Sequence, residues 1–170
     1  MSVPRVWLED CRLLALLVVA GAGGIVVAAQ VMEHAFGHAP CPLCLMQRLW
    51  FLGAGLLALA GVAHSPRRGI WPLLSLLAAA AGAGFALRQL WLQGLPADQV
   101  PACTPPVDFM LQGGYAGLDI LRAMTSGTGD CAKVGWRFLG LTFAGWALVG
   151  FVALIALNVL QLRAILRRCV

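Results

Sequence analysis

The stretch LMQRLWFLGAGLLALAGVAHSPRRGIWPLLSLLAAAAGAGFAL, residues 45–87, decides the fold. It consists of two apolar runs, 45–63 and 70–87, on either side of the short sequence HSPRRG. Each run has about the 17 to 25 mostly apolar residues that cross roughly 30 Å of hydrocarbon as a helix. Because the connection is short and contains a turn-forming Ser-Pro, the two helices must be antiparallel neighbours. The stretch therefore predicts a helical hairpin that crosses a membrane twice.

Two further apolar runs, 13–32 and 138–162, are also long enough to span. The whole chain of 170 residues is 61% hydrophobic and only 11% charged, with a mean hydropathy of +0.86. An ordinary soluble domain has about 25% charged residues. The first run is longer than the apolar region of a signal peptide, about 7 to 15 residues, so we expect it to be retained. We predict one integral-membrane domain over 1–170, an all-α four-helix transmembrane bundle.

The basic residues give the orientation. If four spans alternate, seven arginines fall on one side, which the positive-inside rule assigns to the cytoplasm. These are Arg5, Arg12, Arg67, Arg68, Arg163, Arg167 and Arg168. Five of the seven acidic residues fall on the other side: Glu33, Asp98, Asp108, Asp119 and Asp130. The net charge of +5 therefore reflects topology, and we expect no nucleic-acid partner.

The two outward loops are expected at about 33–44 and 88–137, and the second one is long. Its prolines exclude a continuous helix. Within it, YAGLDILRAM (115–124) is too short and too charged to span, and predicts a short amphipathic helix. That helix would either lie along the membrane interface or pack only on its own loop. Trp136, near the start of the last span, is typical of an interfacial aromatic belt.

This topology separates the six cysteines into two groups. Cys41, Cys44, Cys103 and Cys131 face outward, whereas Cys11 and Cys169 lie at the cytoplasmic ends. In an oxidising compartment, four outward thiols can form two disulfides in three pairings. Proximity makes Cys41 with Cys44 and Cys103 with Cys131 the default pairing. As an alternative, four outward thiolates could hold zinc, although Cys103 and Cys131 are far apart for zinc ligands and we expect no metal.

The sequence CPLCLMQR, residues 41–48, has the pattern of a redox couple. A Cys-x-x-Cys disulfide closes almost no loop and so adds little stability. Cys44 falls near the start of a span, where unpaired backbone N–H groups and the helix dipole favour a thiolate. Arg48 is one helical turn further on and shares the face of Cys44. Arg48 alone could be an interface anchor, but beside Gln47 and a thiolate it predicts a pocket for the carbonyl oxygens of a lipid-soluble quinone.

Cys103 and Cys131 allow two interpretations. Their disulfide could staple the long loop, for about 3 to 4 kcal/mol. This disulfide could instead be reduced by a partner protein and then reoxidised by thiol–disulfide exchange with Cys41 and Cys44.

Three segments, CPLCLMQR, RQLWLQGLP before PAC, and GDCAKVGWRFLGL, together resemble the DsbB family of disulfide bond formation proteins. The resemblance runs from the first span to the last. It implies a four-span inner-membrane protein of bacteria, with both termini cytoplasmic and the four cysteines periplasmic. Its implied activity is to reoxidise the periplasmic thiol oxidase DsbA and to reduce ubiquinone or menaquinone.

The resemblance also implies residue roles. DsbA attacks the loop disulfide at Cys103, Cys131 passes electrons on by attacking Cys41, and Cys44 reacts with the quinone. Arg48 stabilises the thiolate and the quinone oxygen, and Gln47 adds a donor. Some family members have histidine at the position of Gln89, so we assign no proton donor for the quinone there.

Two rival classes remain. Proteins similar to vitamin K epoxide reductase are also four-helix membrane quinone oxidoreductases, but their loop cysteines precede the Cys-x-x-Cys motif. A purely structural four-span protein would make the Cys-x-x-Cys pair and Arg48 coincidental.

Overall fold

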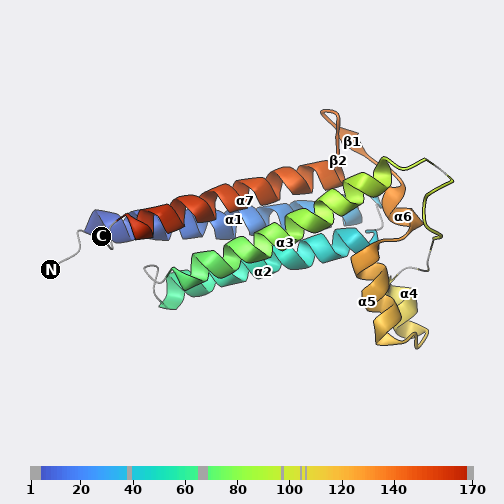
Figure 1. Ribbon diagram of the computed structural model, residues 1–170, viewed down its shortest axis with the longest axis horizontal. Coiled ribbons are helices and arrows are strands. Elements are labelled where there is room, and N and C mark those ends of the chain that lie inside the picture. Colours follow the sequence, from blue (N-terminus) through green and yellow to red (C-terminus); the bar gives the residue numbers. More distant parts are fainter. Residues whose placement is uncertain are drawn as a thin grey trace.

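The computed structural model describes residues 5–37, 40–64, 69–96, 98–103, 105 and 107–167. Four long helices run along the molecule (Figure 1): α1 (Arg5–Phe36), α2 (Pro42–His64), α3 (Ile70–Gln93) and α7 (Phe143–Leu166). Each contains a segment long and apolar enough to cross a membrane. This confirms the predicted all-α four-helix membrane bundle. Arg67, Arg68, Arg168 and Cys169, which entered the orientation and cysteine predictions, lie outside the described residues.

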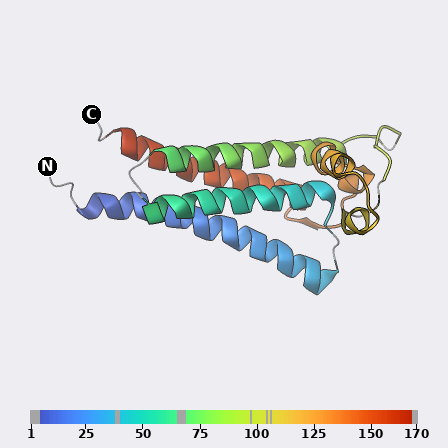
Figure 2. The ribbon, with the colours of Figure 1, turned by 90° about the horizontal axis from the view of Figure 1, so that it is seen from below.

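The four helices form a ring in which α1 packs on α2, α2 on α3, α3 on α7 and α7 on α1. The start of α1 and the end of α7 lie at one end of the bundle, and the long loop lies at the other (Figure 1). Towards the loop end, α1 leans away from its neighbours (Figure 2). The loop carries the short helices α4 (Val107–Gln112), α5 (Gly117–Ser126) and α6 (Gly129–Ala132), then an antiparallel hairpin of β1 (Arg137–Phe138) and β2 (Leu141–Thr142).

The centre of the bundle is a pair of stacked aromatic rings surrounded by small side chains. Phe51 on α2 and Phe151 on α7 stack with ring centroids 3.8 Å apart. Gly82 on α3 makes room for them, because a Cβ atom at this position would lie 2.2 Å from the ring of Phe151. Ala78 and Ala79, on the same helix, are also buried. Small residues on α3 therefore allow the close helix approach that packing in a membrane requires.

Several helix boundaries differ from the sequence prediction. Helix α1 extends past the predicted span 13–32 at both ends, α2 begins at Pro42 instead of residue 45, and α7 ends at Leu166 instead of residue 162. The two differences described next lie beside the long loop.

The third span is predicted to end at Leu87, but α3 continues to Gln93 and stops where Gly94 donates its N–H to the carbonyls of Leu90 and Trp91. Its last turns remain helical because the loop covers them, burying Leu92. The long loop therefore begins at Gly94.

The last span is predicted to begin at Phe138, but residues 137–142 form the hairpin and α7 begins at Phe143. Leu139 and Gly140 have φ values of 51° and 82°, which reverse the chain between the two strands. Thr142 then caps α7, since its hydroxyl accepts a hydrogen bond from the N–H of Gly145 at 3.3 Å.

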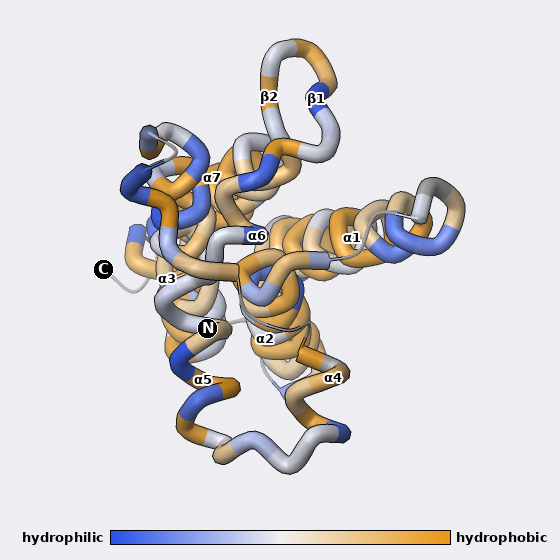
Figure 3. Tube along the Cα trace, turned by 90° about the vertical axis from the view of Figure 1, so that its right-hand side faces the viewer, coloured by the Kyte–Doolittle hydropathy of each residue, from blue (hydrophilic) through white to orange (hydrophobic). Residues whose placement is uncertain are grey.

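The loop is attached to the bundle at Gly127, which joins α5 to α6. This residue has a φ of 80°, and a Cβ there would lie 2.7 Å from side-chain atoms of both Leu43 and Leu92. Glycine is thus required for conformation and for space. Figure 3 shows that α5 carries both hydrophobic and hydrophilic residues, and its Leu118 is 75% exposed. Docking of α5 on the membrane surface stays a prediction.

Candidate active site

Cys41 and Cys44 form the start of α2. Cys41 stands just before the helix, with Pro42 at the first helical position, where a missing N–H costs nothing. The carbonyl of Cys41 accepts from the N–H of Leu45 at 3.1 Å, and its sulfur accepts from the N–H of Cys44 at 3.3 Å. Cys41 is therefore the N-cap residue of α2, and the helix start holds both thiols.

Cys131 on α6 reaches this pair from the long loop. It is 0% exposed and packs in an apolar cluster with Leu43 and Leu92. Its side chain shares a hydrogen bond with Cys41, which raises the pKa of the Cys41 thiol and lowers that of Cys131 from 9.0 to about 6. The shared proton is thus held on Cys41. Cys131 is the better thiolate of the two.

Cys103, in contrast, is exposed. Its segment lies against α6, where the N–H of Gly129 donates to the carbonyl of Ala102 at 3.2 Å. The Cys103 thiol bonds to Asp130, whose pKa is held below its ordinary value first by Lys133 and also by this thiol. Cys103 therefore lies exposed beside α6, whereas Cys131, which is part of α6, is buried.

Neither default pair is a disulfide in the structure, because Cys41, Cys44, Cys103 and Cys131 are all free thiols there. Among the residues that the structure describes, no cluster of three or more His, Cys, Asp or Glu side chains is arranged to hold a metal ion.

Gln89 on α3 belongs to the site, although sequence reasoning did not assign it a role. Its amide nitrogen lies 3.3 Å from the sulfurs of both Cys41 and Cys44. Its oxygen accepts a hydrogen bond of 2.7 Å from the amide of Gln47. Had the helical pattern of the third span been continued past Leu87, Gln89 would have stood out as a polar residue near the end of a membrane helix.

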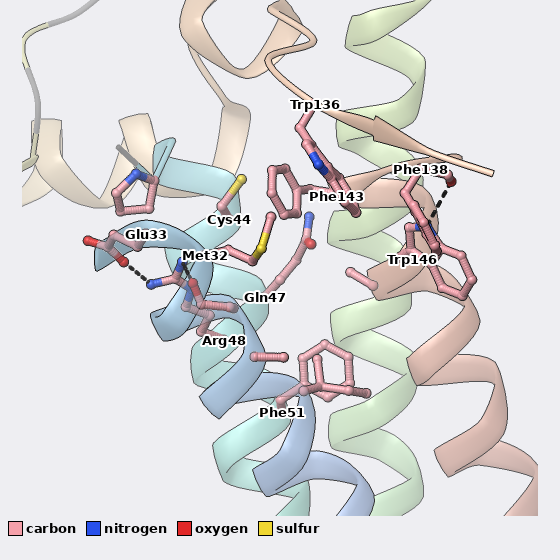
Figure 4. Close-up of a pocket in the computed structure, with 15 residues that line it drawn as sticks. Met32, Glu33, Cys44, Gln47, Arg48, Phe51, Trp136, Phe138, Phe143 and Trp146 are labelled. Carbon is pink, nitrogen blue, oxygen red and sulfur yellow. Dashed lines mark hydrogen bonds and ion pairs between the residues drawn. The ribbon is translucent and has the colours of Figure 1, made fainter. Parts of the chain in front are cut away.

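A cavity of about 380 Å³ lies beside Cys44, between α1, α2 and α7 (Figure 4). Its polar lining includes Cys44, Gln47 and Arg48, which the sequence predicts to share a pocket. The opposite wall is aromatic and comes from the hairpin region and α7. It consists of Trp136, Phe138, Phe143 and Trp146.

The aromatic wall is internally stacked. Trp136 lies 4.7 Å from Phe143 and 5.7 Å from Phe138, between ring centroids. Trp146 donates its indole N–H to the carbonyl of Phe138 at 3.1 Å, which ties the hairpin to α7. Trp136, expected as a belt residue, is therefore part of the cavity wall.

Arg48 points toward α1 (Figure 4). One terminal nitrogen bonds to Glu33 at 2.5 Å and to Gln30 at 2.7 Å, and the other bonds to the carbonyl of Ala29 at 3.3 Å. The structure has no hydrogen bond between Arg48 and Cys44, although both line the cavity. The predicted support of the thiolate by Arg48 is therefore not a direct contact.

Four apolar helices, a Cys-x-x-Cys pair at a helix start and a third thiol in contact with it define a multi-pass membrane protein with a thiol redox site. Comparison with known proteins shows the family to which it belongs. The family model of disulfide bond formation protein DsbB matches residues 11–161.

Curated relatives agree with this match. The chain is 50% identical over 145 residues to disulfide bond formation protein B of Marinobacter nauticus, covering 84% of this chain and 86% of the relative. It is 42% identical over 157 residues to the protein of that name from Saccharophagus degradans, covering 91% and 94%. The corresponding protein of Methylococcus capsulatus is 42% identical over 164 residues, covering 95% and 96%.

The chain belongs to the DsbB family, and the resemblance seen in the sequence is confirmed. Membership makes the protein a protein-disulfide oxidoreductase of the membrane.

Proposed function

We propose that this protein reoxidises a DsbA-type periplasmic thiol oxidase and passes the electrons to membrane quinone. The observation that carries the proposal is the position of Cys131. It lies in contact with Cys41, while Cys44, one turn away, lines a cavity among the membrane helices. In this proposal electrons pass from the exposed Cys103 through Cys131 and Cys41 to Cys44 beside the cavity.

Electron entry begins at Cys103, the exposed thiol of the loop pair. A thiolate of the partner attacks Cys103, forms a mixed disulfide and releases Cys131 as a thiolate. Cys131 lies beside Cys41, so the released thiolate is next to the sulfur that it attacks in the following step. The partner's second thiol then resolves the mixed disulfide, which leaves the partner oxidised and Cys103 reduced.

Electron transfer to the inner pair follows by exchange. The Cys131 thiolate attacks Cys41, breaks the Cys41–Cys44 bond and releases Cys44 as a thiolate. Cys103 then attacks Cys131, which restores the loop disulfide and frees Cys41. The result is an oxidised partner and a reduced Cys41–Cys44 pair that holds the same two electrons and two protons.

The cavity beside Cys44 fits a quinone head group, either ubiquinone or menaquinone. Its volume of about 380 Å³ lies within the roughly 300 to 1,000 Å³ of small-molecule sites. Aromatic rings on one wall suit a planar ring, and Arg48 and Gln47 are the polar residues that would face its oxygens. A bound quinone would accept two electrons and two protons, while Cys41 and Cys44 return to the disulfide.

The location that goes with this function is the bacterial inner membrane, with both termini cytoplasmic. In support, Arg12 and Arg163 lie towards the end where α1 begins and α7 ends, and the loop cysteines lie at the other end (Figure 1).

Quinone reduction by the purified protein, supplied with a reduced DsbA-type oxidase, tests the proposal. We expect wild type and Cys11→Ser to turn over, because Cys11 lies far along α1 from the site. Cys44→Ser and Cys103→Ser should not reduce quinone when the reduced oxidase is the electron donor. Cys103→Ser should still reduce quinone once its Cys41–Cys44 pair has been reduced chemically.

If wild type never reduces quinone and its loop disulfide is inert to the oxidase, the proposed function is wrong. Metal analysis of the same preparation would then examine the zinc alternative.

A further inference from the structure

The side-chain amide of Gln89 bridges the two sulfurs of the Cys-x-x-Cys pair. Its nitrogen lies 3.3 Å from Cys41 Sγ and 3.3 Å from Cys44 Sγ. The residue is only 3% exposed, so these contacts are shielded from water.

Gln47 fixes which end of the Gln89 amide faces the sulfurs. Its own nitrogen donates to the Gln89 oxygen at 2.7 Å, and Gln47 is 4% exposed. Because that oxygen is occupied, the N–H groups of Gln89 are directed at the thiols. The Cys44 sulfur also lies 3.7 Å from the Gln89 oxygen, a longer contact in which the thiol would donate.

The donors that the structure gives to this pair are neutral amides. Cys41 Sγ accepts from the N–H of Cys44 and from Gln89, and Cys44 Sγ accepts from Gln89. The guanidinium of Arg48 is bonded to α1. An N–H group stabilises a thiolate more than it stabilises a neutral disulfide sulfur.

We propose that Gln89 is a catalytic residue that stabilises the reduced Cys41–Cys44 pair through hydrogen bonds to both sulfurs, with Gln47 as its positioning residue. Reduction breaks the sulfur–sulfur bond, and the two electrons from the attacking thiol leave Cys44 as a thiolate beside the Gln89 amide. Gln89 thereby sets how readily the pair accepts electrons. The place of this step in the electron relay rests on the proposed function.

The test is the equilibrium of the pair with a dithiothreitol redox buffer, in a full-length Cys103→Ser, Cys131→Ser background. Gln89→Met keeps the length of the side chain and removes the donor. We expect the equilibrium constant for reduction to fall about tenfold, which is about 30 mV for a two-electron couple. Gln93→Met is the matched control, because Gln93 lies one turn further along α3 and bonds to Thr142.

Unchanged equilibria for Gln89→Met, in a protein that unfolds at the wild-type temperature, would overturn the inference. So would an equal shift in Gln93→Met. If Gln89→Met does not fold, Gln47→Met gives the decisive measurement, since it leaves Gln89 in place but removes its orientation. It should shift the equilibrium in the same direction by a smaller factor, and no shift would overturn the inference.

This measurement uses neither quinone nor a DsbA-type partner. A protein that fails to reduce quinone can therefore still show the Gln89 effect, and a protein that turns over normally can still lack it.

Discussion

Arg48 on α2 and Glu33 on α1 form an ion pair of 2.5 Å at the rim of the cavity. The side chains are 18% and 26% exposed, so the pair is largely shielded from solvent. It holds α1 to α2 near the end where α1 leans away from the bundle (Figure 2). Arg48 therefore shapes the proposed quinone site from the α1 side, in addition to offering it a charge.

Removal of this arginine should weaken quinone binding. In Arg48→Ala we expect the quinone KM to rise by about 10-fold to 100-fold, because hydrogen bonds to a charged group contribute about 1.5 to 3 kcal/mol. Glu33→Gln should change KM less, since Arg48 keeps its bonds to Gln30 and Ala29. Steady-state kinetics with varied quinone gives the result, with Arg12→Ala as the control. Wild-type KM and kcat in Arg48→Ala would contradict this role.

The pKa of Cys131 predicts a pH dependence. In a reduced Cys44→Ser, Cys103→Ser protein, Cys131 should change from thiol to thiolate around pH 6, instead of near its ordinary value of 9.0. As pH rises through 6, thiolate appears, and at pH 7 most of Cys131 is charged. Ultraviolet thiolate absorbance, measured as the difference from the same protein carrying Cys131→Ser, follows this change.

The hydrogen bond from Cys41 is the main cause of the lowered Cys131 pKa, so its removal should raise the midpoint. Cys41→Ala in the same background lacks the donor, whereas Cys41→Ser retains one. Identical midpoints in these two variants would show that the contact with Cys41 is not responsible.

Gly127 should control electron transfer from the loop to the inner pair. In Gly127→Ala the new methyl group meets Leu43 and Leu92 at 2.7 Å and would displace α6, which carries Cys131. A displacement of about 1 Å can slow a reaction by about 100-fold, so we expect transfer from Cys131 to Cys41 to slow by at least tenfold. Single-turnover measurements of the two disulfides report this step.

The control is Gly114→Ala, which has a similar φ of 70° but nothing within 4 Å of the added Cβ. It separates the effect of backbone strain from that of the contact. The chemically reduced Cys41–Cys44 pair should react with quinone at the wild-type rate in both variants. Equal transfer rates in the two variants would argue against the role of Gly127 in placing Cys131.

Two glycines of α3 offer a matched test of the bundle core. Gly82→Ala places a Cβ 2.2 Å from the ring of Phe151 and should destabilise the protein by about 1 to 3 kcal/mol. Gly84→Ala meets nothing within 4 Å and should be neutral or slightly stabilising. Thermal unfolding in detergent compares them, and equal unfolding temperatures would contradict the close packing at Gly82.

The sequence predicts the four spans well, because they depend on short-range patterns. Cys44, Gln47 and Arg48 line one cavity in the structure, and their roles there stay predictions. Apolar runs mark membrane helices, and helical spacing puts Cys44 and Arg48 on one face. The ends of the spans are harder to predict. Arg88 and Gln89 are polar and suggest a loop, yet Gln89 is buried in α3, where the thiols and Gln47 satisfy its amide.

Contacts between distant parts of the chain could not be derived from spacing. Gln89 lies 48 positions from Cys41 and 45 from Cys44, and only the packing of α3 on α2 brings them together. Between Arg137 and Thr142 the hairpin is apolar like the span that follows, so hydropathy does not separate them. Its turn depends on the positive φ of Leu139 and Gly140, which hydropathy does not report.

Cys103 is exposed and Cys131 is completely enclosed, so the two sulfurs of the loop pair are not equivalent to a molecule in solution. In the proposed relay, an attacking thiol would approach Cys103, and Cys131 would exchange with Cys41, which it contacts. The proposed electron flow through the loop pair would therefore have a direction set by the accessibility of its two sulfurs. Small thiols would be poorly placed to reduce Cys131 directly, because they would have to attack Cys103, the same exposed sulfur that the protein partner attacks.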